Sequence, residues 1–177
     1  MSSRPTARMT NDVPPAGTTL FLIGMRVTRP WRVRAWVSVM AAMPRMLWHL
    51  RRRPEAGMLD SRLYLGRSLM VVSYWRSTDD LRRFASDPDA PHLPVWRWFN
   101  RELADTGSVG IWHETYVVAE HESISSGMVP QGLARAVGWR PVGPGTATAA
   151  GRLIRSRAGV DRVVSVNDAA NSGDSQT

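Results

Sequence analysis

The chain of 177 residues contains no cysteine. This absence excludes disulfides, a thiol nucleophile, thiolate-bound haem, iron–sulfur clusters and cysteine-based zinc sites. No apolar run approaches the roughly 20 residues that a membrane-spanning helix needs, and the first residues lack the apolar core of a secretory signal. These absences predict a soluble, cytoplasmic protein without a membrane partner, in which any catalysis uses groups other than thiols.

Lysine is absent too, so all 23 basic residues are arginines. The formal net charge of +8 resembles that of nucleic-acid-binding proteins. However, residues 26–53 hold eight arginines and no acid, whereas residues 54–127 are net negative. A charged helix face is usually a solvated face, and a GC-rich coding bias explains the exclusive use of arginine. We therefore expect no nucleic-acid partner.

The familiar enzyme signatures are missing as well. The chain has no glycine-rich phosphate loop after a strand, no GxSxG elbow and no pair of histidines spaced to face one metal ion. Such a sequence is compatible with a cofactor-independent enzyme and with a binding module alike.

The middle of the chain alternates between strand and helix patterns. Dense apolar and β-branched runs predict strands at residues 18–27, 59–65, 68–75 and 109–118. Pro30, with Thr28 as a possible cap, predicts a helix start, and Ser77 with two acids predicts another. A further helical segment spans residues 91–105, and Pro44 should kink or divide the first helix.

This order of elements predicts an α+β fold of ferredoxin-like βαββαβ type, a four-stranded antiparallel sheet with helices on one face. The other sheet face would stay uncovered, so we expect a second copy to pack there and form a homodimer. Residues 1–17 are predicted to be a disordered arm and 18–122 the domain. Residues 123–145 are predicted to be a covering segment or lid, and 146–177 a flexible tail.

The first helix carries one apolar stripe, at spacings of 4, 3, 4 and 3 residues, formed by Trp36, Met40, Met43, Leu47 and Leu50. Methionine and tryptophan could wall a cofactor pocket, but apolar residues at helical spacing more often pack against a sheet. We interpret the stripe as core.

The last strand contains titratable side chains that alternation separates. Trp112, Glu114 and Tyr116 should face one side of the sheet, and His113 the other side with Ile111 and Thr115. His113 could be a general base, a hydrogen-bond donor to bound oxygen or an axial haem ligand. It could equally be a hydrogen-bonded structural histidine.

A second candidate cluster lies on the helical segment 91–105, where His92, Trp96, Phe99 and Asn100 share a face. Its aromatic rings could wall a planar substrate, and Asn100 could orient a ligand carbonyl. The hairpin adds three further candidates on neighbouring strands, where one cavity could bring them together, and these are Arg62, Tyr64 and Tyr74. No candidate metal site follows from His49 or His121, which we interpret as surface residues.

Several segments together resemble the DUF4188, or monooxygenase-like, family of dimeric α+β barrels, related to the antibiotic-biosynthesis monooxygenases. The segments are FLIGMRVTRPWRVRAW, AMPRML, YLGRSLMVVSYWRS, DPDAPHLPVWRWFNR and VGIWHETYVV. The resemblance covers residues 19 to about 142.

The resemblance implies oxygenation of a conjugated small molecule, an activity expected in secondary metabolism, without metal or flavin. Trp112 or Trp96 would wall the substrate, His113 or His92 would accept a proton, and Asn100 or Tyr74 would steady an oxyanion. Two alternatives remain. One is a haem-dependent lyase related to aldoxime dehydratases, with His113 as the ligand, and the other is a non-catalytic small-molecule binding module.

Overall fold

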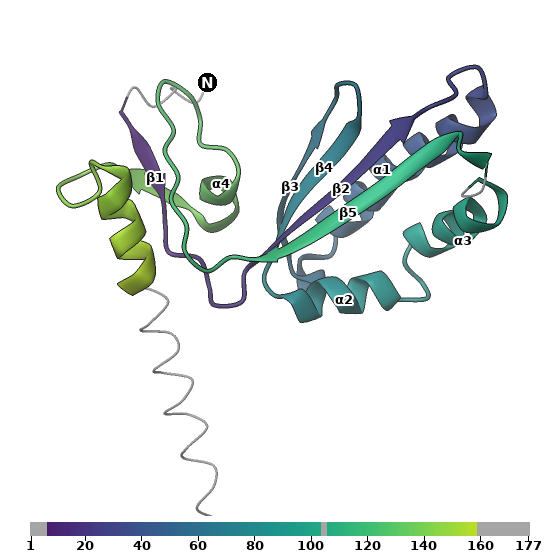
Figure 1. Cartoon of the computed structure of the whole chain (residues 1–177). Coiled ribbons are helices and arrows are strands. Elements are labelled where there is room, and N and C mark those ends of the chain that lie inside the picture. Colours follow the sequence, from purple (N-terminus) through teal and green to yellow (C-terminus); the bar gives the residue numbers. More distant parts are fainter. Residues whose placement is uncertain (1–6, 104–105, 159–177) are drawn as a thin grey trace, which may run out of the picture. The chain divides into compact units, whose positions relative to one another are not determined.

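The computed structural model describes residues 7–103 and 106–158. The chain divides into two compact units. We call Thr19–Tyr116 the sheet unit, and the segments up to Thr18 and from Val117 together the terminal unit. Figure 1 shows the sheet unit around strands β2 to β5 and the terminal unit around β1 and α4.

The sheet unit is built on a four-stranded sheet of order β3-β4-β2-β5. Its strands are β2 (Thr19–Val27), β3 (Met58–Tyr64), β4 (Leu69–Trp75) and β5 (Val109–Val117). Strand β4 pairs antiparallel with both β2 and β3, with Thr19 opposite Trp75 and Ser61 opposite Ser73. This is the ferredoxin-like topology, so the predicted fold class is confirmed.

Helices α1 (Val33–Arg51), α2 (Thr78–Ser86) and α3 (His92–Glu102) pack on one face of this sheet. One core cluster joins Met25 of β2 and Val109 of β5 to Val39 and Phe99 of the helices. A second cluster contains Leu50, Trp75 and Leu81, from α1, β4 and α2. Each fully buried large apolar side chain contributes about 1.5–3 kcal/mol, so these clusters hold the helices to the sheet.

The start of α2 follows the predicted capping pattern. The Ser77 hydroxyl accepts a hydrogen bond from the Asp80 amide at 3.1 Å. The largely buried Asp80 carboxylate accepts hydrogen bonds from Arg76 at 2.8 Å and Arg83 at 2.7 Å. The hydrogen bond from Arg76, the larger cause, and the one from Arg83 lower the pKa of Asp80 against the opposing effect of burial. Gly57, at φ 87°, lies so close that a Cβ there would meet the Asp80 carboxylate at 2.5 Å.

Helix α1 differs from its prediction at two points. It begins at Val33, not at Pro30, and has no side-chain cap. The Thr28 hydroxyl instead donates to the Gly107 carbonyl. The helix also runs as one element through the exposed Pro44, so it is not divided there, and a kink at Pro44 stays a prediction.

The terminal unit contains a two-stranded sheet of β1 (Met9–Asn11) and β6 (Trp139–Pro141), with the short helix α4 (Leu133–Val137). All residues of β1 are buried. The structure thus differs from the expected disordered arm over residues 1–17, of which 1–6 lie outside the described range. Composition misses β1 because its partner strand lies about 130 residues further along the chain.

The C-terminal segment is also more ordered than its composition indicates. Residues 149–158 are helical, and the buried Arg152 pairs with Glu122 at 2.6 Å. The expected flexible tail therefore does not begin at residue 146, and residues 159–177 lie outside the described range. Segment 123–145 supplies α4 and β6 to the terminal unit, and a lid role for it stays a prediction.

Residues 7–103 and 106–158 contain neither a membrane-spanning helix nor a cluster of metal ligands. No helix there has the length and hydropathy to cross a bilayer. No group of three or more His, Asp or Glu side chains there gathers as metal ligands would.

Candidate active site

A cavity of about 450 Å³ lies inside the sheet unit, between the helix-bearing sheet face and helices α1, α2 and α3. This volume suits a small organic molecule. The wall is mainly apolar, with side chains that include Phe21, Leu47, Val71, Trp75, Trp96 and Ile111. Its polar groups are fewer, and they are Ser73, Arg82, His92, His113 and Thr115.

The apolar stripe of α1 serves both the core and the cavity. Trp36 and Met40 pack against a core cluster, whereas Met43, Leu47 and Leu50 line the cavity. The interpretation of the stripe as core is thus only partly correct, because three of its five residues border a cavity. Helical spacing identifies the face that is turned inward, but it does not indicate whether the space opposite that face is filled.

His113 lies on the cavity side of β5 together with Ile111 and Thr115. The alternation predicts this grouping, but it does not predict which face borders the cavity. Its ring lies 5.9 Å from the ring of Phe21, at an angle of 40°. The side chain is exposed, and neither ring nitrogen has a hydrogen-bond partner within the described part of the chain. An imidazole in this position is accessible to a ligand and able to accept a proton from it.

His92, at the first turn of α3, also lines the cavity but is held differently. Its Nε2 lies 3.1 Å from the Ala85 carbonyl oxygen. Because a carbonyl only accepts, Nε2 donates the proton, and in the neutral ring Nδ1 carries the lone pair. Among the described residues Nδ1 has no partner, and it is shielded from solvent. The ring also packs on Phe84 at 4.7 Å, so its orientation is determined by contacts on two sides.

The rest of the α3 cluster divides between cavity and surface. Trp96 and Phe99 line the cavity and stack on each other, with ring centroids 5.7 Å apart at 17°. Asn100 is exposed and is not among the residues that line the cavity. The shared helical face that we predicted therefore brings His92, Trp96 and Phe99 together, but not Asn100.

Six other candidates lie on the opposite face of the sheet. Val71 and Ser73 face the cavity, so Tyr74 of β4 and its cross-strand neighbours face away. The same register places Arg62 opposite Val72 and Tyr64 opposite Met70 on that face. On β5 the alternation directs three further candidates away from His113, and these are Trp112, Glu114 and Tyr116.

Two contacts on that opposite face involve the candidates of β5. The indole of Trp112 lies against Gly24 so closely that a Cβ at Gly24 would meet it at 2.4 Å. The Tyr116 hydroxyl donates to Glu114 Oε2 at 2.7 Å, and this hydrogen bond raises the pKa of Tyr116. These groups are separated from the cavity by the sheet itself, so they and the two histidines cannot act on one ligand in a single sheet unit.

Sequence reasoning missed Ser73 and Arg82 as cavity residues. The Ser73 hydroxyl accepts from Trp75 Nε1 at 3.0 Å and donates to the Phe21 carbonyl at 3.3 Å. Alternation along β4 could have placed Ser73 beside Val71 and Trp75. For Arg82 the chain offers no such signal, since its place depends on how α2 packs.

The chain is similar to several solved structures. The cofactor-independent oxygenase SnoaB from Streptomyces nogalater is 18% identical, covering 60% of this chain and 97% of that chain with a TM-score of 0.43. An aldoxime dehydratase, OxdRE, solved in complex with butyraldoxime, is 19% identical with a TM-score of 0.50. That match covers 66% of this chain but only 36% of the dehydratase. At these identities the likeness concerns the fold alone.

No curated protein matches the chain. The profile of the monooxygenase af470-like family matches residues 18–133, which include the whole sheet unit and all the residues that line the cavity. The chain therefore belongs to the monooxygenase af470-like family.

Proposed function

We propose that this protein is a monooxygenase that oxidises a conjugated, largely apolar small molecule inside the cavity of the sheet unit, without metal or flavin. The observation that carries the proposal is the cavity itself, whose apolar wall is interrupted by His92 and His113. Membership of a monooxygenase-like family supports the reaction class.

The proposed reaction needs little from the protein beyond a base and an apolar enclosure. Removal of a proton from an activated C–H group gives a carbanion, which can pass one electron to dioxygen. The resulting radicals combine to a peroxide, and loss of water leaves a carbonyl group. A methylene and O₂ thus become a carbonyl and water, with all four electrons supplied by the substrate. An apolar wall keeps the anion and the peroxide away from bulk water.

The two histidines are suited to different roles in this proposal. His113 is accessible and has no partner within the described residues, so we assign it the role of general base. His92 is held by the Ala85 carbonyl and its Nδ1 is shielded, so we assign it substrate positioning from the cavity wall. Trp96 would stack on the conjugated rings. Asn100 and Tyr74, which lie outside the cavity lining, have no part in this proposal.

The haem alternative fits the residues less well. A metal-bound histidine usually donates its other ring N–H to a carbonyl or carboxylate, and His113 has no such partner in the described residues. His92 has one, but its free nitrogen is shielded from solvent. Besides the histidines, Arg82 is the one basic residue among those that line the cavity, so few cations are available there to pair with the carboxylates of haem. We therefore derive no step through haem.

Oxygen uptake tests the proposal. Protein treated with a chelator should consume oxygen only when a conjugated phenol or polyene with an activated C–H group is added. His113→Ala should lower kcat/KM by about 10²- to 10⁴-fold, the usual contribution of a general base. His49→Ala is the matched control, because His49 lies on α1 outside the cavity lining and its loss should leave the rate unchanged.

Other outcomes would identify the alternatives. An absorption band of bound haem that disappears in His113→Ala would replace the proposal with the haem lyase. Saturable binding of the same compounds without any oxygen uptake would make the protein a binding module. Equal rates for the wild type and His113→Ala would reject His113 as the base.

We also propose that the protein is a homodimer formed through the sheet face opposite the cavity. That face presents large side chains that remain partly exposed in the single chain, Trp112 at 39% and Tyr116 at 51%. A second copy would remove them from water. Sedimentation analysis should give twice the chain mass of 19.7 kDa, and a monomeric mass at micromolar concentration would reject the dimer.

A further inference from the structure

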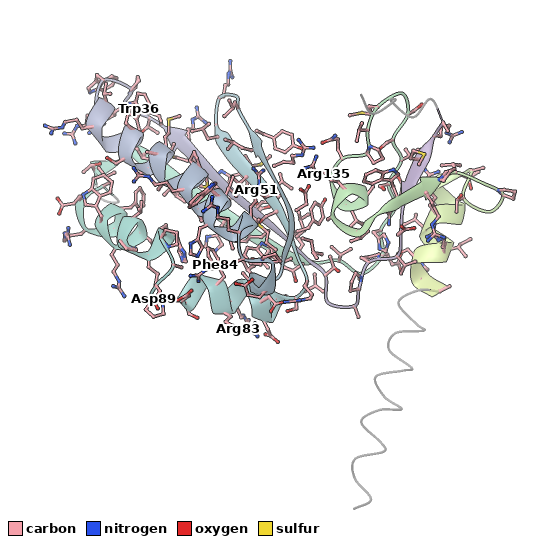
Figure 2. The ribbon with its side chains drawn as sticks, turned by 180° about the vertical axis from the view of Figure 1, so that it is seen from behind. Trp36, Arg51, Arg83, Phe84, Asp89 and Arg135 are labelled. Carbon is pink, nitrogen blue, oxygen red and sulfur yellow. The ribbon has the colours of Figure 1, made fainter. Side chains whose placement is uncertain are left out.

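The outer side of helix α1 carries a second stripe, opposite the one that faces the cavity. Its members recur at steps of three or four residues, and they are Arg34, Val37, Ala41, Arg45, Trp48 and Arg52. All six are exposed. Figure 2 shows the molecule from the side on which α1 lies in front, with Arg51 labelled on this helix. We call this stripe the outer face of α1, and Trp31 lies two residues before the helix begins.

Charge on this part of the chain is of one sign. Residues 26–53 contain eight arginines and no aspartate or glutamate. None of these arginines forms an ion pair with an acid anywhere in residues 7–103 or 106–158. Elsewhere in the same unit arginines do have partners, such as Arg76 and Arg83 on Asp80.

Large apolar side chains stand among these arginines instead of acids. Trp31 is 73% exposed and Trp48 is 57% exposed, and Val33 and Val37 are exposed as well. Arg52 stacks over the Trp48 ring at 3.6 Å from its centroid. A helix face that is simply solvated usually carries both signs of charge and forms ion pairs four residues apart. Two exposed indoles are not expected on such a face.

We propose that the outer face of α1 docks on the surface of an anionic lipid bilayer. Arginines on a helix are attracted to anionic headgroups, and tryptophan rings prefer the boundary between headgroups and acyl chains. The inference departs from our sequence-based expectation of no membrane partner, because only the structure shows that Trp48 and the arginines of this stripe are exposed together on one side of α1. It stands independently of the proposed reaction.

A bilayer explains the pattern better than other polyanions do. Duplex nucleic acid would engage the arginines through its phosphates, but it offers nothing to Trp31 and Val37. An acidic protein surface would likewise pair with the arginines and leave the apolar side chains without a partner. The inner side of α1 lines the apolar cavity, so docking by the outer side would bring that cavity close to the compartment in which apolar molecules dissolve.

Vesicle sedimentation tests the inference on the full-length protein. It should bind vesicles of equal parts phosphatidylglycerol and phosphatidylcholine at low salt, and not vesicles of phosphatidylcholine alone. Each arginine near an anionic surface contributes about a fivefold gain in affinity. The triple variant Arg34→Glu, Arg45→Glu, Arg52→Glu should therefore bind the anionic vesicles at least about a hundredfold more weakly. Trp31→Ala with Trp48→Ala should weaken vesicle binding but not binding to duplex DNA.

The matched control changes the same charge elsewhere in the sheet unit. Arg67, Arg97 and Arg101 are exposed on the β3–β4 turn and on α3, and their triple change to Glu should leave vesicle binding within about threefold of the wild type, with circular dichroism confirming that all variants are folded. No binding of the wild type to anionic vesicles would overturn the inference. So would equal losses in the two triple variants, or vesicle binding that ignores the loss of both indoles.

Discussion

The face of the sheet that meets the helices and the face that points away from them are formed by alternating residues of the same strands. On the helix-bearing face Val71, Ser73 and Trp75 of β4 are buried and border a cavity. On the opposite face Trp112 and Tyr116 of β5 remain partly exposed. The first face owes its chemistry to enclosure by the helices of its own unit, whereas the second offers a surface for another molecule.

Removal of one tryptophan from each face should show the difference between the two faces most clearly, as a difference in the free energy of unfolding. Trp75 is 2% exposed and packs on Phe84 at 5.5 Å, so Trp75→Ala should lower the free energy of unfolding by about 3–5 kcal/mol. At protein concentrations low enough to keep the chain monomeric, Trp112→Ala should lower it by only about 1 kcal/mol, because that indole is partly solvated in the single chain. Urea unfolding measures both changes.

Equal losses in the two tryptophan variants would contradict this comparison for a single chain. They would indicate that the face bearing Trp112 is as fully covered as the core in solution. Repeating the unfolding at several protein concentrations would then sharpen the result, since stability that rises with concentration is the signature of a homodimer.

Gly24 tests whether Trp112 is held in place against the opposite face. A Cβ at Gly24 would overlap the indole at 2.4 Å, so Gly24→Ala should cost about 1–3 kcal/mol through forced movement of the ring. The control is Gly110→Ala on β5, where a Cβ would meet nothing within 4 Å, and it should change stability by less than about 0.5 kcal/mol. Both values come from thermal unfolding. If Gly24→Ala melts like the wild type, Trp112 moves freely on this face.

The smallest expected effect concerns the pair formed by Tyr116 and Glu114. The hydrogen bond to the Glu114 carboxylate favours the protonated phenol and raises the pKa of Tyr116. Tyr116 should therefore ionise at higher pH than an ordinary tyrosine, and Glu114→Gln should bring its titration down to the usual range. Ultraviolet titration against a Tyr116→Phe reference measures this shift. Because both side chains are exposed in the single chain, Glu114→Gln should leave the unfolding free energy of the monomeric chain unchanged.

Local patterns were enough to predict the strands of the sheet, its topology and which residues of β5 share a side with His113. Ser77 capped α2 as expected because a hydroxyl before two acids is a strong local signal. Helical spacing placed His92, Trp96 and Phe99 together for the same reason. Asn100 escaped this pattern because it lies at the edge of the inward-facing arc of α3, where spacing alone cannot separate lining from surface.

The larger departures all involve partners far apart along the chain. Strand β1 depends on β6, and the buried Arg152 depends on Glu122. Neither segment has enough apolar residues for its composition to predict an ordered structure. The proton at His92 Nε2 likewise follows from the Ala85 carbonyl at the end of a different helix.

By itself the sequence determined the fold class, the family and which strand residues share a face, because periods of two and 3.6 residues are properties of a single segment. Only the tertiary structure decided that the Met and Leu stripe of α1 borders an open cavity of about 450 Å³. Only the tertiary structure also showed that Trp48 is exposed on the outer face of the same helix among arginines that have no acidic partner in the described residues. Both depend on how tightly separate elements pack, which is a sum over contacts between distant residues that no local pattern contains.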